Sequence, residues 1–115
     1  MSNSLEIINI SVINELKEIM GDDFCFLINK YQADSEDKIS EMKSAFNSKD
    51  VDTFKMIVHS LKGSSLNIGM HKLAYVASQI EDRVSSENIE SLHELLSLLE
   101  YEFSRAKEAI AQLMR

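Results

Sequence analysis

The sequence predicts an all-α fold: an antiparallel up-and-down four-helix bundle with an additional short N-terminal helix. A chain of 115 residues is about the length of one domain, so residues 1–115 are expected to share a single core. Proline is absent and only three glycines occur, which leaves few places for turns. Apolar residues recur with a period near 3.6 and no stretch alternates as a strand would. Short connections between such stretches favour antiparallel neighbours.

Each predicted helix has an apolar stripe and a residue suited to its end. Gly21 ends the first helix, and Asp22 is expected to cap the second. The polar segment 47–50 ends the second helix, and its last residue, Asp50, is the expected N-cap of the third. Gly69 suits the left-handed position that ends the third helix. In chain order, the five stripes are Val12, Leu16 and Ile19; Phe24, Leu27, Ile28, Tyr31, Ile39, Met42 and Phe46; Val51, Phe54, Val58, Leu61, Ser65 and Ile68; Leu73, Val76, Ala77, Ile80 and Val84; and Leu92, Leu96, Leu99, Phe103, Ala106, Ile110 and Leu113.

Composition excludes several classes of protein. A net charge of −7 argues against nucleic acid as a partner, because phosphate backbones select basic surfaces. No apolar run approaches the roughly 20 residues of a membrane span, and the segment 1–6 lacks the basic start of a signal peptide. One cysteine, Cys25, cannot form an internal disulfide and says nothing against a reducing cytoplasm, so a cytoplasmic location is the default expectation. Its apolar surroundings predict a small buried side chain rather than a nucleophile.

The usual motifs of catalysis are missing. Three widely spaced glycines cannot form a glycine-rich phosphate loop, which excludes ATP binding through such a motif. His59, His71 and His93 do not have the spacing of metal ligands on one helix, so no metal is expected. The charge is nevertheless segregated: the 28 residues from 53 to 80 contain three lysines and no acidic residue. Chance clustering remains an equal explanation unless a chemical site lies in this window.

His59 is the candidate for that site. At 100° per residue it lies about 130° from the centre of the third helix's apolar stripe, on the solvent side. Lys55, Lys62 and Gly63 lie one turn away, and two lysines beside an imidazole suit an arriving phosphoryl group. A glycine inside a helix costs about 0.8–1 kcal/mol relative to alanine. Gly63 therefore indicates either a partner that approaches the backbone beside His59 or close helix packing.

Glu81 lies about 80° from the centre of the fourth helix's stripe, at the edge of the buried face. From there its carboxylate could accept the Nδ1 proton of His59 and leave Nε2 as the nucleophile. Gln79 is the competing candidate, although it lies on the opposite flank. A solvated glutamate at a helix edge remains the alternative for Glu81.

The segment His59–Ser65 resembles the phosphorylation motif of histidine-containing phosphotransfer (HPt) domains, H-x-L-K-G-(S/A)-(S/A). The similarity continues through 67–69, Leu73 and 80–81, and in outline covers the chain. Such domains are four-helix-bundle phosphocarriers of multistep phosphorelays, without kinase activity. The resemblance implies that His59 is the phospho-acceptor, that Lys62 neutralises phosphoryl oxygens, and that Gly63 gives the partner clearance. It also implies that Glu81 bonds the imidazole and that Ser64 lies near the site.

The implied partners are response-regulator receiver domains, whose aspartates donate and accept the phosphoryl group, and a hybrid sensor histidine kinase. Mg²⁺ is expected on the receiver, and no cofactor on this chain. A lysine-bearing face on an acidic body would steer docking, with Lys55, Met56 and Leu66 as further contacts. A monomer is the default expectation. Two alternatives remain open: a non-catalytic helical adaptor, and an HPt segment cut from a hybrid or chemotaxis-type kinase, although Met1 and the full set of helices favour a free-standing protein.

Overall fold

The computed structural model describes residues 8–86 and 88–114, so Met1 and Glu87 lie outside the described residues. Within them the all-α prediction is confirmed. Two short 3-10 turns, η1 (Gly21–Asp23) and η2 (Ile89–Leu92), lie before the second and fifth helices. The α-helices are α1 (Ile10–Met20), α2 (Phe24–Ser48), α3 (Val51–Ile68), α4 (His71–Val84) and α5 (His93–Leu113).

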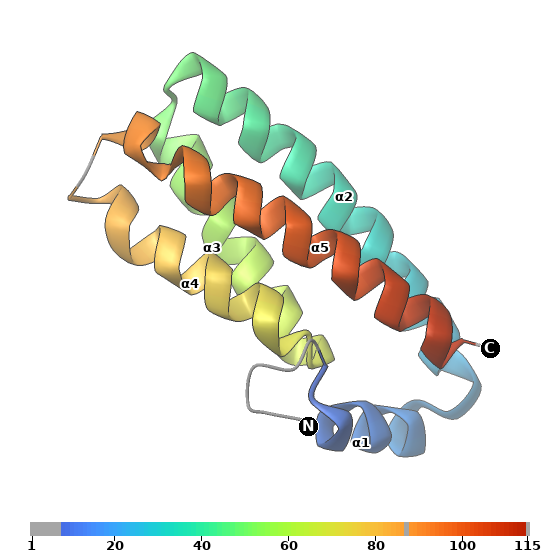
Figure 1. Ribbon diagram of the computed structural model, residues 1–115. Helices are drawn as coiled ribbons and strands as arrows, with labels where there is room; N and C mark the ends of the chain where they lie inside the picture. Colours follow the sequence, from blue (N-terminus) through green and yellow to red (C-terminus); the bar gives the residue numbers. More distant parts are fainter. Residues whose placement is uncertain (1–7, 87, 115) are drawn as a thin grey trace.

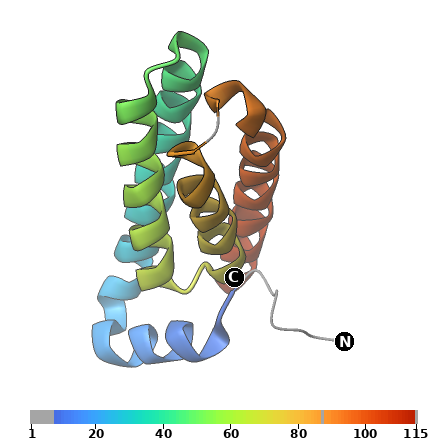
Figure 2. The ribbon, with the colours of Figure 1, turned by 90° about the vertical axis from the view of Figure 1, so that its left-hand side faces the viewer.

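Helices α2 to α5 lie side by side and alternate in direction, while α1 crosses one end of the bundle (Figure 1). The view turned by 90° gives the same arrangement, with α1 beneath the bundle (Figure 2). Helix α3 packs between α2 and α4, and α5 packs mainly against α4. The seam between α3 and α4 is therefore one side of the bundle, and the seam between α2 and α5 is the opposite side.

The predicted stripes form the core almost throughout. Every stripe residue of α4 is buried, as are all those of α3 except Val51. Helix α1 is the exception, because Ile19 is exposed and the stripe is centred instead on the buried Ile13. Ile13 is the one buried residue of α1, which crosses the end of the bundle rather than lying along its side (Figure 1).

The predicted helix ends at Gly21 and Asp50 are confirmed, and the predicted cap at Asp22 is wrong. Gly21 ends α1 with a φ of 56°, and the Asp50 side chain accepts a hydrogen bond from the Thr53 backbone N–H at 3.2 Å. Asp22 does not cap α2, because it lies within the 3-10 turn and the helix begins two residues later at Phe24. The 3-10 turn carries the chain from α1 into α2 without a side-chain cap.

The turn from α3 to α4 sets the geometry of the site. Gly69 adopts a φ of 85°, as predicted for a helix-ending glycine. The Met70 N–H donates to the Ser65 carbonyl at 2.8 Å, and the Gly69 N–H donates to the Leu66 carbonyl at 3.2 Å. This pair of bonds is the Schellman arrangement, which satisfies carbonyls at a helix end. The Asn9 N–H donates to the Gly69 carbonyl at 2.8 Å, which ties the start of α1 to this turn.

Three side chains depart from a simple apolar core. Cys25 is exposed, so the prediction of a buried side chain is wrong; its Sγ lies 3.9 Å from Met114 Sδ. Ser65, predicted to face the core, is buried and lies 2.7 Å from the Tyr31 hydroxyl, whose pKa is raised by burial. Glu102 is buried on α5, and its Oε1 has no hydrogen-bond partner in the described structure.

Candidate functional site

His59 lies on α3 with its side chain 70% exposed, as the helical period predicts. Its Nδ1 lies 2.5 Å from Glu81 Oε2 on the neighbouring helix α4. Glu81, rather than Gln79, is thus the residue that reaches the imidazole. The other ring nitrogen, Nε2, has no partner among the described residues. A neutral imidazole that donates its Nδ1 proton to a carboxylate carries a lone pair on Nε2, the form required of a nucleophile.

Lys62 contacts the same carboxylate. Its Nζ lies 2.5 Å from Glu81 Oε1, so each carboxylate oxygen has one partner on α3. The sequence places two lysines beside His59 with no carboxylate between them, whereas the fold brings the Glu81 carboxylate between His59 and Lys62. The contact with Lys62 holds the pKa of Glu81 below its ordinary range; desolvation opposes this shift, and His59 adds a smaller lowering contribution. The site is therefore built around an ionised carboxylate.

Gly63 and Ser64 follow Lys62 on α3. Gly63 has ordinary helical backbone, and a Cβ atom added there would meet nothing within 4 Å. Close helix packing is thus excluded as the reason for this glycine, and the open space beside His59 is consistent with clearance for a partner. Ser64 donates its hydroxyl to the Leu61 carbonyl at 3.2 Å, within its own helix.

The surface around His59 carries the predicted contact residues. Met56 is 67% exposed and Leu66 is 52% exposed, and Lys55 is exposed with no ion pair among the described residues. Sequence reasoning missed Tyr75, an aromatic side chain on the outer face of α4 that is also 52% exposed. The available signal was its position outside the apolar stripe of α4. A groove of about 290 Å³ between α3 and α4 is lined by Lys62, Leu66, His71, Ala74, Tyr75 and Ser78.

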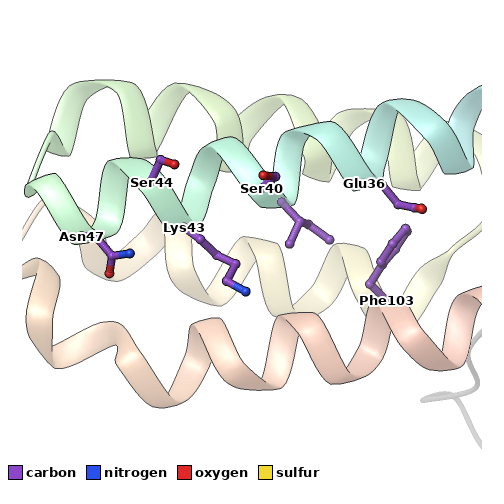
Figure 3. A pocket seen from close by; sticks show the side chains of 7 residues that line it. Glu36, Ser40, Lys43, Ser44, Asn47 and Phe103 are labelled. Carbon is purple, nitrogen blue, oxygen red and sulfur yellow. The ribbon is translucent and has the colours of Figure 1, made fainter.

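The opposite side of the bundle holds a groove of about 370 Å³ between α2 and α5. There Lys43 points from α2 toward α5 and Phe103 points from α5 toward α2 (Figure 3). Lys43 forms an ion pair with Glu100 at 3.4 Å. No histidine or cysteine lines this groove. In the described part of the chain, no three histidine, cysteine or acidic side chains form a possible metal site. None of the described helices is long and apolar enough to cross a membrane.

Comparison with known proteins identifies the family and the fold. Residues 27–113 match the model of the Hpt domain family. The chain belongs to this family. Membership implies a phosphotransfer role in a phosphorelay, and stand-alone Hpt proteins are phosphocarriers that are generally not classed as enzymes. No curated protein sequence matches the chain.

Solved Hpt structures share the fold. Histidine-containing phosphotransfer protein B (HptB) from Pseudomonas aeruginosa PAO1 has a TM-score of 0.89 at 25% identity, over 95% of each chain. A putative histidine-containing phosphotransfer protein from rice has a TM-score of 0.83 at 16% identity, over 98% of this chain and 89% of its own. MtHPt2 from Medicago truncatula has a TM-score of 0.83 at 21% identity, over 94% of this chain and 77% of its own. The rice and Medicago proteins show likeness of fold alone.

Proposed function

We propose that this Hpt protein carries a phosphoryl group on Nε2 of His59, taken from an aspartyl phosphate of one receiver domain and passed to the aspartate of another. The observation that carries this proposal is the orientation of the imidazole. Nδ1 is held 2.5 Å from Glu81 Oε2, while the ring is 70% exposed and Nε2 has no partner among the described residues.

The transfer balances in charge and atoms. The Nε2 lone pair attacks the phosphorus, the N–P bond forms, and the bond from phosphorus to the aspartyl oxygen breaks. The receiver regains a carboxylate, and the imidazole keeps its Nδ1 proton and becomes cationic. Glu81 stabilises that cation as a buried aspartate does in a catalytic triad. The return step reverses the same bonds with the second receiver, so neither ATP nor a cofactor on this chain is needed.

The surface around His59 supports a receiver as the partner. Lys55 contributes positive charge beside the ring, whereas the rest of the chain is acidic. Receiver active sites are acidic and hold Mg²⁺, so this contrast would steer docking. Met56 and Leu66 give the interface an apolar component, and the open space at Gly63 admits the partner's backbone. We further propose a cytoplasmic monomer supplied by a hybrid sensor histidine kinase.

A panel of purified receiver domains, phosphorylated with radiolabelled acetyl phosphate, tests the proposal. At least one receiver should lose its label to the wild-type protein, and His59→Gln should abolish this uptake while the helical circular dichroism signal is retained. His71→Gln is the matched control, because His71 is exposed on the same side of the bundle and should leave uptake intact. If the panel binds but no label moves, the chain is an adaptor and the proposal is wrong.

A further inference from the structure

We propose that Lys62 is a positioning residue that acts through Glu81, setting the tautomer of His59 rather than neutralising the phosphoryl group. The inference rests on the proposed function and names a different task for Lys62 within it. It starts from one arrangement: a single carboxylate on α4 whose two oxygens each meet a different side chain of α3.

The geometry commits Lys62 before any phosphoryl group arrives. Its Nζ lies 2.5 Å from Glu81 Oε1, and its side chain is largely buried between α3 and α4. Lys55, on the other side of His59, is exposed and has no ion pair among the described residues. The two lysines that look equivalent in the sequence are thus in different states. Lys55 is available to phosphoryl oxygens, whereas Lys62 would have to give up its ion pair to reach them.

The pair also holds the carboxylate in place. A glutamate with one partner can rotate about its terminal bond, but Glu81 is held from both ends, by Lys62 at Oε1 and by His59 at Oε2. Because the contact with Lys62 already restricts the rotamers of Glu81, less side-chain entropy is lost when Oε2 accepts the Nδ1 proton. Lys62 therefore aims Oε2 at the imidazole.

Ionisation of Glu81 decides which ring nitrogen carries the proton. An ionised carboxylate only accepts, so the proton of neutral His59 is placed on Nδ1 and Nε2 keeps its lone pair. A protonated carboxyl could instead donate to Nδ1, which would move the ring proton to Nε2 and block the nucleophile. Near neutral pH Glu81 is ionised with or without Lys62, because the ordinary glutamate pKa is about 4.3. The task of Lys62 is therefore to aim Oε2 at Nδ1 through its contact with Oε1.

Nitrogen-15 NMR of the imidazole tests this without any phosphotransfer. When the wild-type ring is neutral, it should be protonated at Nδ1 and bare at Nε2. Lys62→Gln should raise the Nε2-protonated fraction several-fold, Lys62→Arg should restore the wild-type pattern, and Lys55→Gln should leave the tautomer unchanged. An unchanged tautomer in Lys62→Gln overturns the proposal. If that variant does not keep its helical circular dichroism signal, Lys62→Met, which retains the aliphatic stem, replaces it.

A double-mutant cycle gives the second readout, the rate of label uptake from a receiver. Lys62→Gln should slow uptake about tenfold, or about 1.4 kcal/mol, in the protein with Glu81. In a Glu81→Gln background the same change should cost less than about twofold, because the lysine then has no carboxylate to act on. Equal losses in the two backgrounds would mean that Lys62 acts directly on the phosphoryl group. If the wild-type protein accepts no label from any receiver, the proposed function fails, and the NMR result still decides the role of Lys62.

Discussion

Gly63 allows stability and transfer to be separated, because a side chain at this position should affect them in opposite directions. The residue lies inside α3 with ordinary helical backbone, and an added Cβ would meet nothing within 4 Å. Gly63→Ala should therefore stabilise the fold, since it removes a glycine from a helix interior without a clash. Gly63→Gln should keep most of this gain and project a longer side chain into the space beside His59.

The expected gain is about 0.8–1 kcal/mol, the difference between glycine and alanine inside a helix. For 115 residues, an unfolding entropy of about 2.1 cal/mol/K per residue gives about 0.24 kcal/mol/K. The melting temperature of Gly63→Ala should thus rise by about 3–4 °C. Gln also favours helix, so Gly63→Gln should melt above the wild type while its uptake of label from a receiver falls at least tenfold.

Gly69 is the matched control. Its φ is 85°, and an added Cβ would lie 3.1 Å from Val12, so Gly69→Ala should lower the melting temperature through both strain and crowding. Melting curves and label uptake are measured on the same samples of each variant. A destabilised Gly63→Gln would refute the open-space reasoning, and a stable Gly63→Gln that transfers at the full rate would refute the clearance role.

Three further predictions concern stability. Tyr31→Phe should lower the free energy of unfolding by about 1 kcal/mol, because Ser65 loses its buried partner; an unchanged urea midpoint would contradict this. Glu102→Met should raise the free energy of unfolding by about 1–3 kcal/mol, since it removes a buried oxygen without a partner; a lower midpoint would show that Glu102 has a partner in solution. The third prediction concerns Glu81, whose pKa is lowered in the folded state. Its ion pair with Lys62 therefore stabilises the protein above the ordinary glutamate pKa of about 4.3. This contribution is lost as the pH falls through the folded-state pKa. Melting temperatures of the wild type and Glu81→Gln should therefore differ at pH 7 and converge below pH 4; parallel curves would count against the ion pair.

The periodicity of apolar residues predicted the features that depend on a single helix. The buried faces of α3 and α4 and the exposure of His59 follow from 3.6 residues per turn, whatever the neighbouring helices are. Gly69 was predictable because a helix-ending residue with left-handed backbone is usually glycine, whatever surrounds it. The motif His59–Ser65 predicted the family, which the match over residues 27–113 confirms.

The wrong predictions depend on how the elements meet. Cys25 lies in an apolar run of four residues, 24–27, that spans more than one face of α2, so only part of it can be buried. Phe24 and Ile28 turn into the core, which leaves Cys25 outside. Glu102, for which the sequence analysis made no prediction, is the opposite case: glutamate is mostly exposed in proteins, yet this one lies on the flank of α5 that the bundle covers. Neither outcome can be read from a period, because both depend on the rotation of a helix within the bundle.

Glu81 can pair with His59 and Lys62 only if α4 has the right rotation about its axis and if Glu81 lies at the same height along the bundle as its partners. The turn between α3 and α4 sets this height. His59 lies nine residues before Ile68, the last residue of α3, and Glu81 lies ten residues after His71, the first residue of α4. At 1.5 Å per residue, both are about 13–15 Å from the turn. One residue added between the turn and Glu81 would move its carboxylate by about 1.5 Å along α4 and 100° around it, away from both partners on α3.

The short turn keeps this register because it is held from two sides. The bonds from Gly69 and Met70 close the end of α3, and the start of α1 binds the turn through the Asn9 N–H and packs Val12 against Gly69. Helix α1 is remote from His59 in the sequence and crosses the end of the bundle (Figure 1). It nevertheless bears on the site, because the turn it covers fixes how α4 lies against α3, and with it the carboxylate that orients His59.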